Sequence, residues 1–278
     1  MRLDKYLSER YPDVTRSQIT VAIKRGDFKV NGQIVKAGYE LRPTDVVAGE
    51  MQPITVTAEP EPIALDIVYE DEYLMVINKP RGMVVHPGAG VKSGTVLNAL
   101  LGRGQDHLER AGIVHRLDKN TAGLLVIAKT ADCQQRLGCM FEKHEIKRTY
   151  WGLVDGVVST DQIIDRNIVR HPQHRTIFTV TDHGGRRAVT HLHVIERYAR
   201  HTLCEFTLET GRTHQIRVHC KSIHHPILGD PEYNSGNGQM LEAVKLDFVH
   251  PITGQPIHLA IQPTKAFVEA REKCYHLK

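Results

Sequence analysis

The residue with the clearest potential for chemistry is Asp118, an acid that stands among the bases Arg116 and Lys119. Apolar runs of β type flank it at 112–114 and 124–128, so we expect Asp118 on the loop between them, close to solvent. A carboxylate beside cationic groups is stabilised in its ionised form, which suits a nucleophile or charge stabiliser better than a general acid. The loop holds no second acid, which a typical glycosidase would need.

Histidines offer an alternative kind of site. The chain has 17 of them, ten between His171 and His225, and His191 and His193 would point to the same side of a strand, as in a zinc-dependent hydrolase. The sequence has no HExxH motif, however, and its five cysteines form no CxxC pair. We therefore predict no metal site, and metal analysis of the purified protein would separate the two interpretations. Neither G-x-G-x-x-G nor a Walker loop occurs, so no cofactor is predicted.

Composition places few further limits on function. A chain of 278 residues can form one large domain or a large and a small one. Its net charge of +4 permits a polyanionic partner without proving one. The sequence shows neither a long uncharged apolar run nor a signal peptide, and the odd number of cysteines suggests reduced thiols. We expect a cytoplasmic monomer without a membrane span.

The elements that must position Asp118 are mostly strands. The stretch LDIVYEDEYLMVINKPRGMVVHPG is typical of strand, turn, strand and loop. Five later segments alternate apolar and polar residues and are predicted as strands: LHVIERY, LCEFTLET, HQIRVHC, AVKLDFVH and PIHLAI. The stretch TADCQQRLGCMFEKHEI is predicted to be helical. Strands outnumber helices and do not alternate regularly with them, so we predict an α+β domain on a largely antiparallel, mixed sheet.

A separate small α/β unit is predicted at the N-terminus. Apolar spacing indicates a helix over 3–11 and a second helix that begins at a capping box, Thr15 with Gln18, and ends at Gly26. The stretch FKVNGQIVK then predicts a hairpin around its Asn-Gly pair.

Charge suggests how this unit is used and where it ends. Arg16, Lys24 and Arg25, with Lys29 nearby, could form a basic ledge for phosphates, although charge alone favours a solvated helix face. Residues 57–72 carry six acids and no base, which is typical of a linker. We predict a small domain over 1–55, an acidic linker over 56–66 and a catalytic domain over 67–278.

Motif order adds a resemblance to known families. An isolated Arg-x-Asp is more often a structural ion pair, but HRLDKNTAGLL resembles the HRLDxxTSG signature of the RluA-type pseudouridine synthases, with Ala122 where serine is usual. INKPRGMVVHPG, KRTYWGLV and GRTHQIRVH with HPILGD resemble three further segments of that family, and VVHPG is most similar to its RluD-like branch. Residues 1–50 resemble the small RNA-binding domain first named from a ribosomal protein of the small subunit.

The resemblance implies roles for particular residues. Asp118 would be the catalytic acid, Tyr150 would lie against the target base, and Arg217 would pair with Asp118. Arg116 would fill the space that the base leaves or hold the RNA backbone, because a guanidinium can stack like a base and bind phosphate. His115 and Ile216 join the substrate-binding set; we expect Ile216 and Arg217 to alternate across a strand.

The implied reaction is the isomerisation of uridine to pseudouridine in RNA, which needs no cofactor or metal and requires the base to leave its stack. The branch implies a stem-loop of large-subunit (23S) ribosomal RNA, free or in a precursor ribosomal particle. Two alternatives remain open: another ribosomal or transfer RNA site, and an inactive assembly factor that only binds ribosomal RNA. Loss of Asp118 would abolish catalysis but spare binding, which separates enzyme from binding protein.

Overall fold

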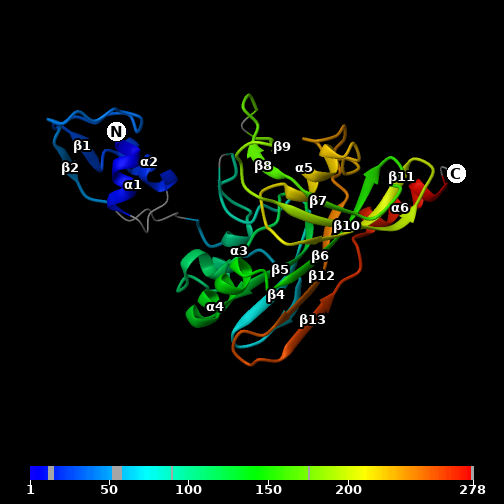
Figure 1. Ribbon diagram of the computed structural model, residues 1–278. Helices are drawn as coiled ribbons and strands as arrows, with labels where there is room; N and C mark the ends of the chain where they lie inside the picture. The colour runs from blue at the N-terminus through cyan, green and yellow to red at the C-terminus, as the bar shows by residue number, and fades with distance from the viewer. Residues whose placement is uncertain (12–15, 52–57, 89, 175, 277–278) are drawn as a thin grey trace. The chain divides into compact units, whose positions relative to one another are not determined.

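The computed structural model describes residues 1–11, 16–51, 58–88, 90–174 and 176–276, except for the side chains of 16–18 and 276 (Figure 1). The chain divides into two units, Met1–Thr57 and Ala58–Lys278. Within the described ranges, no helix is both long and apolar enough to cross a bilayer.

The first unit consists of two helices and a small sheet. Its elements are α1 (Leu3–Arg10), α2 (Arg16–Arg25), β1 (Phe28–Val30) and β2 (Val47–Gly49). Its core collects the buried side chains of Leu3, Leu7, Ile19, Ala22, Ile23, Phe28 and Val30. Both predicted helices are confirmed, and Gly26 follows α2 with a φ of +90° that favours glycine. The predicted capping box lies in part outside the described residues.

The predicted N-terminal hairpin is wrong, although its turn forms. Asn31 and Gly32 both have positive φ, and Val30 and Gln33 exchange backbone hydrogen bonds of 2.8 and 3.0 Å. The chain then leaves the sheet, and β1 pairs antiparallel with β2 instead. The Asn31 side chain explains the change of partner, because its Oδ1 accepts a 2.9 Å bond from the backbone N–H of Val46, next to β2.

The second unit contains most of the secondary structure. Its helices are α3 (Val96–Gly102), α4 (Ala131–Glu142), α5 (Gln215–Ser222) and α6 (Lys265–His276), with a 3₁₀ turn η1 (Glu109–Gly112). Its strands are β3 (Ile67–Glu70), β4 (Leu74–Lys79), β5 (Ala122–Ala128), β6 (Lys147–Asp155), β7 (Gln162–Asp165), β8 (Asn167–Arg170), β9 (Phe178–Thr181), β10 (Val189–Arg197), β11 (His201–Leu208), β12 (Leu241–Val249) and β13 (Pro256–Ala260).

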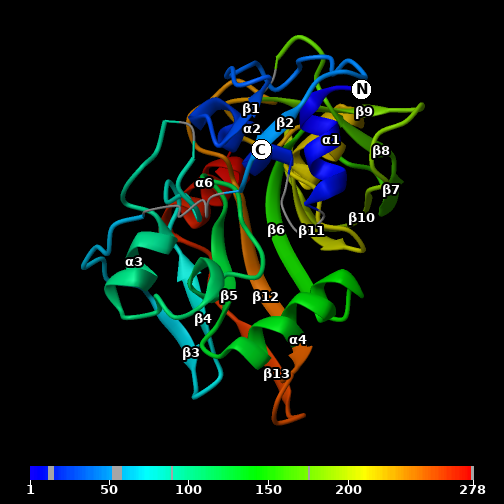
Figure 2. The same cartoon turned by 90° about the vertical axis from the view of Figure 1, so that its left-hand side faces the viewer.

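Nine of these strands form one mixed sheet in the order β3-β4-β5-β12-β6-β11-β10-β7, with β13 paired to β12. Figure 2 shows β3, β4, β5, β12 and β6 side by side in this order. The pair β5 and β12 is parallel, and the other pairs are antiparallel. Strands β8 and β9 form a separate two-stranded sheet. The predicted α+β class with a largely antiparallel sheet is confirmed.

Strand β5 is buried on both faces, which explains why its sequence is an unbroken apolar run. Leu125 and Ile127 pack in a cluster with α3, whereas Leu124, Val126 and Ala128 pack in a cluster with α4. Helix α6 packs against β6 and β11 further along the sheet (Figure 1). The Asp118 loop leads directly into β5, so both layers hold its end in place.

One predicted strand is wrong: HQIRVHC forms helix α5. The run alternates in sequence, but Gln215–Cys220 are all buried, and a short segment buried on all sides fits either structure. Tertiary bonds select the helix, because Gln215 Nε2 donates to Val189 O at 2.9 Å and to Thr190 Oγ1 at 3.0 Å. Ile216 and Arg217 therefore do not alternate across a strand.

The acidic segment that we predicted as a linker is attached to the second unit from Ala58 on. The Glu61 carboxylate accepts bonds of 3.0 and 3.1 Å from the Gly94 backbone, and Asn98 Nδ2 donates to Glu59 O at 2.8 Å. These bonds hold the segment against α3. At least one of the acids that suggested a solvated linker, Glu61, therefore binds the start of this helix instead. Residues 56–57 lie outside the described ranges.

Candidate active site

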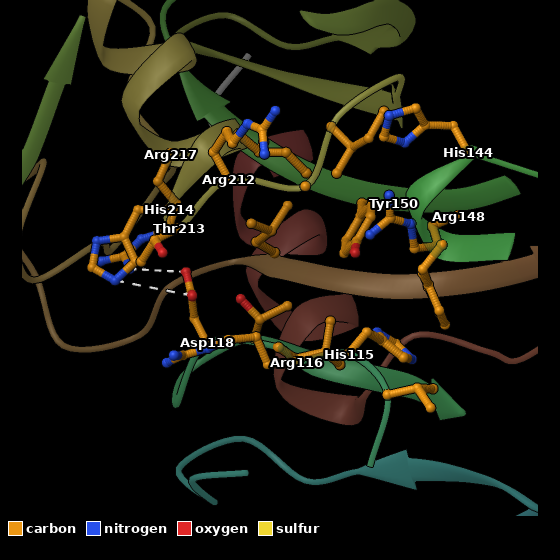
Figure 3. A pocket seen from close by; sticks show the side chains of 18 of the residues that line it. His115, Arg116, Asp118, His144, Arg148, Tyr150, Arg212, Thr213, His214 and Arg217 are labelled. Atoms are coloured by element: carbon orange, nitrogen blue, oxygen red, sulfur yellow. Dashed lines mark hydrogen bonds and ion pairs between the residues drawn. The ribbon is translucent and has the colours of Figure 1, made fainter. Parts of the chain in front are cut away.

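Asp118 lies on a loop before β5, as the sequence predicts (Figure 3). The preceding run 112–114 is not a strand; only Ile113 pairs, with Ile127. Beyond the acid, Thr121 N donates to Asp118 O at 3.1 Å. The next glycine, Gly123, must lack a side chain, because it has a φ of +114° and a Cβ would lie 2.2 Å from a backbone oxygen of β12. The motif therefore specifies both the turn and its docking on the sheet.

A buried lysine fastens the same loop from the other side. Lys79 is fully buried, and its Nζ donates to Pro80 O, Met83 O and Lys119 O at 3.0, 2.9 and 3.2 Å. The backbone N–H of Gly82 also donates to Lys119 O, at 2.8 Å. Burial lowers the pKa of Lys79 to about 7, although the negative charge of Asp118 acts to raise it. The loop after β4 and the Asp118 loop thus share one anchor.

We expect Lys79 to make the protein more stable as pH rises above 7. The amine loses its proton near pH 7 in the folded chain and near 10.5 in the unfolded chain. The unfolded state binds more protons in this window, so the free energy of unfolding rises with pH, on the order of 1 kcal/mol per pH unit. Urea unfolding at pH 7 and 9 should show this rise in the wild type relative to Lys79→Met. Parallel pH dependence of the two proteins would contradict the assignment.

Arg217 joins Asp118 to two further carboxylates. Its Nη1 donates to Asp118 Oδ2 at 3.1 Å, while Nε and Nη2 donate to Asp230 at 2.7 and 2.9 Å. Nη2 also contacts Glu232, and the guanidinium lies 4.9 Å from the centre of the Tyr233 ring. The Arg217 side chain is only 3% exposed and that of Asp230 is fully buried. Of these three acids Asp118 lines the pocket, so the carboxylate that faces the pocket is held by a buried cation.

His214 lies beside this cluster at the start of α5. Its Nε2 is 3.9 Å from Asp118 Oδ1, and its Nδ1 is 2.9 Å from the Tyr233 hydroxyl, which accepts from the Phe178 backbone. Burial lowers the pKa of His214, so the ring is neutral near pH 7. Its backbone is left-handed, with φ 57° and ψ 19°, a strained conformation that often marks functional sites.

Asp118 and Tyr150 line one pocket of about 540 Å³, together with Ile216. Tyr150 lies on β6 and is 6% exposed, and burial raises the pKa of its phenol, which therefore stays protonated. In Figure 3 the Tyr150 ring lies across the pocket from Asp118. Helix α5 directs Ile216 to the pocket and Arg217 to Asp118, although we expected a strand there.

The two residues before the acid differ in their surroundings. His115 Nε2 accepts a 2.9 Å bond from the Val126 backbone, and the ring stacks on Phe141 with centres 4.4 Å apart. Burial lowers the pKa of His115 to about 3, so it is neutral and serves to fix the loop on β5. Arg116 is exposed and lines the pocket. It is therefore the better placed of the two to meet a ligand in the pocket.

The predicted basic ledge belongs to the first unit. Lys24 and Lys29 are exposed. Arg25 donates to the Asp27 carboxylate through Nε at 2.7 Å and also through Nη2. Two of its guanidinium nitrogens are therefore already bonded to a carboxylate. Arg16 is the first residue of α2, and its side chain lies outside the described residues.

Sequence reasoning did not assign Lys79, His214, Asp230, Glu232 or Tyr233 to the site. Asp230 ends the HPILGD segment, and an acid that follows an apolar run was a usable signal. Of the histidines considered for zinc, His191 lies 2.7 Å from Glu209, and a different acid holds His193. Across the described ranges, no group of three or more His, Cys, Asp or Glu side chains is arranged to hold a metal.

Comparison with known proteins identifies the class of this fold and site. Residues 73–222 match the RNA pseudouridylate synthase family, and residues 1–47 match the S4 domain. The chain belongs to the RNA pseudouridylate synthase family, with an RNA-binding S4 domain at its N-terminus. It is a pseudouridine synthase, an isomerase that acts on RNA.

Individual relatives cover nearly the whole chain. A protein of Neisseria meningitidis serogroup A named ribosomal large subunit pseudouridine synthase D is 42% identical over 282 residues, which cover 92% of this chain and 74% of that protein. A Bacillus subtilis protein named uncharacterized RNA pseudouridine synthase YlyB is 44% identical, covering 91% and 88%. The structure of human RNA pseudouridylate synthase domain containing 4 matches with a TM-score of 0.62 at 24% identity over 75% of this chain and 92% of that one, which shows a shared fold.

Proposed function

We propose that this synthase isomerises uridines in a stem-loop of large-subunit (23S) ribosomal RNA and that Asp118 is its catalytic acid. The target is supported by relatives named for the large ribosomal subunit at 42% identity over 92% of the chain. The single observation that carries the role of Asp118 is the 3.1 Å contact between its pocket-facing carboxylate and Arg217. A buried guanidinium keeps such a carboxylate anionic and fixes its direction.

The reaction needs an oriented anion more than a proton donor. The bond between uracil N1 and the ribose breaks, the ring turns, and a new bond joins C5 to the ribose. C5 then loses its hydrogen as a proton and N1 gains one, so the reaction is balanced without an added reactant. Asp118 can attack the ribose carbon, add to the ring or remove a ribose proton, and its anionic form serves each route.

The pocket wall suggests how the base is held. We propose that Tyr150 lies against the uracil, because its phenol is buried, neutral and opposite Asp118. Ile216 would pack on the ring or ribose. We assign Arg116 to the space that the flipped base leaves in the stem, because its side chain is exposed next to the acid. His115 would act indirectly, by fixing the loop.

The S4 domain would add affinity through phosphate contacts. Lys24, Arg25 and Lys29 are exposed bases of this domain at α2 and β1, and Arg25 is engaged by Asp27. Replacing Lys24 and Lys29 by methionine should weaken RNA binding and reduce the slope of log affinity against log salt by about one per lost contact. Filter binding at several salt concentrations checks this. An unchanged slope would make these bases a solvated face.

The proposed target is tested by mapping. Wild-type protein is incubated with full-length large-subunit, small-subunit and transfer RNA transcripts, and pseudouridines are located by carbodiimide labelling and primer extension. We expect new pseudouridines in one stem-loop of the large-subunit RNA. Modification of transfer RNA or small-subunit RNA alone would contradict the target while leaving the enzyme class intact.

A further inference from the structure

The pocket extends beyond the groups that surround Asp118. At the end away from Asp118 it is lined by Phe141 and Glu142 of α4, by His144 and by Arg148. In Figure 3, Arg148 and His144 lie on the right and Asp118 on the left, with Tyr150 between them. This second end has no part in holding the catalytic carboxylate.

Arg148 is an arginine of this pocket that has no hydrogen-bonding or ion-pair partner among the described residues. It lies on β6 two residues before Tyr150, so both side chains point to the same face of the sheet. Its guanidinium carbon is 5.5 Å from the centre of the Phe141 ring. Among the described residues Arg148 forms no ion pair, and its buried Nε has no hydrogen-bond partner. Because Nε is buried, a ligand can meet this unpaired guanidinium only at its two terminal nitrogens.

Gly211 leaves uncovered the edge of Arg148 that carries its two terminal nitrogens. A Cβ on Gly211 would lie 3.2 Å from Nη1, 3.7 Å from Nη2 and 3.9 Å from Cζ of Arg148. The added Cβ would thus lie closer to both terminal nitrogens than to Cζ. A side chain at position 211 would therefore cover the edge of Arg148 that carries these nitrogens. The φ of Gly211 lies outside the left-handed range, so its backbone does not require glycine. The missing side chain leaves space instead.

We propose that the open edge of Arg148 in front of Gly211 binds a backbone phosphate of the substrate RNA next to the target nucleotide. The terminal nitrogens of an arginine form a planar fork that matches two phosphate oxygens. A stacked base is a poorer fit, because His115 covers one face of Phe141 and Arg148 lies over its ring. Since Arg148 and Tyr150 share one strand face, this phosphate would set the register of the uracil against Tyr150 and Asp118. The inference rests on the proposed role of this pocket as the uridine site.

The test pairs protein variants with altered RNA. Arg148→Met removes the fork, and Gly211→Ala blocks it while keeping the charge. The RNAs are the target stem-loop with a single neutral methylphosphonate at each of the phosphates flanking the uridine. On unmodified RNA we expect each variant to lose about 10- to 100-fold in kcat/KM, the range of a charge-assisted hydrogen-bonded pair. At one phosphate position, the methylphosphonate should lower kcat/KM of the wild type by a similar factor. The same methylphosphonate should lower kcat/KM of the two variants hardly further.

A matched control is Lys147→Met, an exposed neighbour on the same strand that does not line the pocket. It removes the same charge and should lose less than threefold, with equal sensitivity to every methylphosphonate. The proposal is overturned if Arg148→Met and Gly211→Ala show the same methylphosphonate sensitivity as the wild type at all positions. Affinities measured on the same RNAs decide the phosphate contact independently of turnover, and turnover of unmodified RNA by the wild type tests the proposed function separately.

Discussion

Replacing Asp118 by asparagine is expected to lower the single-turnover rate of isomerisation by at least about 10⁴-fold and to leave RNA affinity within about threefold. Asparagine has the shape of aspartate and can still accept a bond from Arg217. It carries no negative charge, so it can neither attack carbon nor remove a proton. Rates measured at saturating enzyme separate this chemical loss from any change in binding.

The matched control for this variant is Asp106→Asn, which removes an exposed acid outside the pocket and should leave the rate unchanged. A rate for Asp118→Asn within tenfold of the wild type would exclude Asp118 as the reacting carboxylate. Loss of RNA affinity equal to the loss of rate would instead assign Asp118 to binding.

The second large effect concerns stability. Arg217→Met should lower the free energy of unfolding by about 3–5 kcal/mol, because it leaves Asp230 buried without a cation beside Asp118 and Glu232. Activity should fall as well, since Asp118 loses the contact that orients it. Urea unfolding near pH 7 measures the first effect, and turnover of the folded fraction measures the second.

Two further variants show whether burial of the charges is the cause. Arg136→Met breaks an exposed i,i+4 pair with Asp132 and should cost less than about 1 kcal/mol. Arg217→Met combined with Asp230→Asn should recover part of the loss, because the remaining buried group is then neutral. A single-variant loss no larger than that of Arg136→Met would show that the ion-pair cluster does not stabilise the fold.

The sequence predicted the parts of the site that depend on local pattern. The Asp118 loop is recognisable because apolar runs and a compact turn surround it, and four of the nine strands of the sheet, β10 to β13, follow from their alternation. Helix α5 was missed because its six buried residues in succession carry no period that separates helix from strand. What selects the helix is the set of bonds that Gln215 forms with distant segments, and such bonds cannot be read from neighbouring residues.

The same limit explains the missed site residues. His214 lies 3.9 Å from Asp118, Tyr233 reaches the acid through Arg217 and His214, and Lys79 reaches it through Lys119 O, forty residues along the chain. The N-terminal hairpin failed for a related reason, since the Asn31 side chain binds the strand end at Val46 rather than the residues after its own turn. Short motifs fix turns, whereas partners depend on tertiary contacts.

The most direct test of the central claim is hydrogen release from ring carbon five of uridine. Large-subunit RNA transcribed with tritium at this position is incubated with the wild type and with Asp118→Asn. Isomerisation must expel that hydrogen, so we expect release by the wild type alone, in an amount that matches the pseudouridine formed. Equal release by both proteins would contradict the role assigned to Asp118, and release by neither would contradict the proposed RNA target.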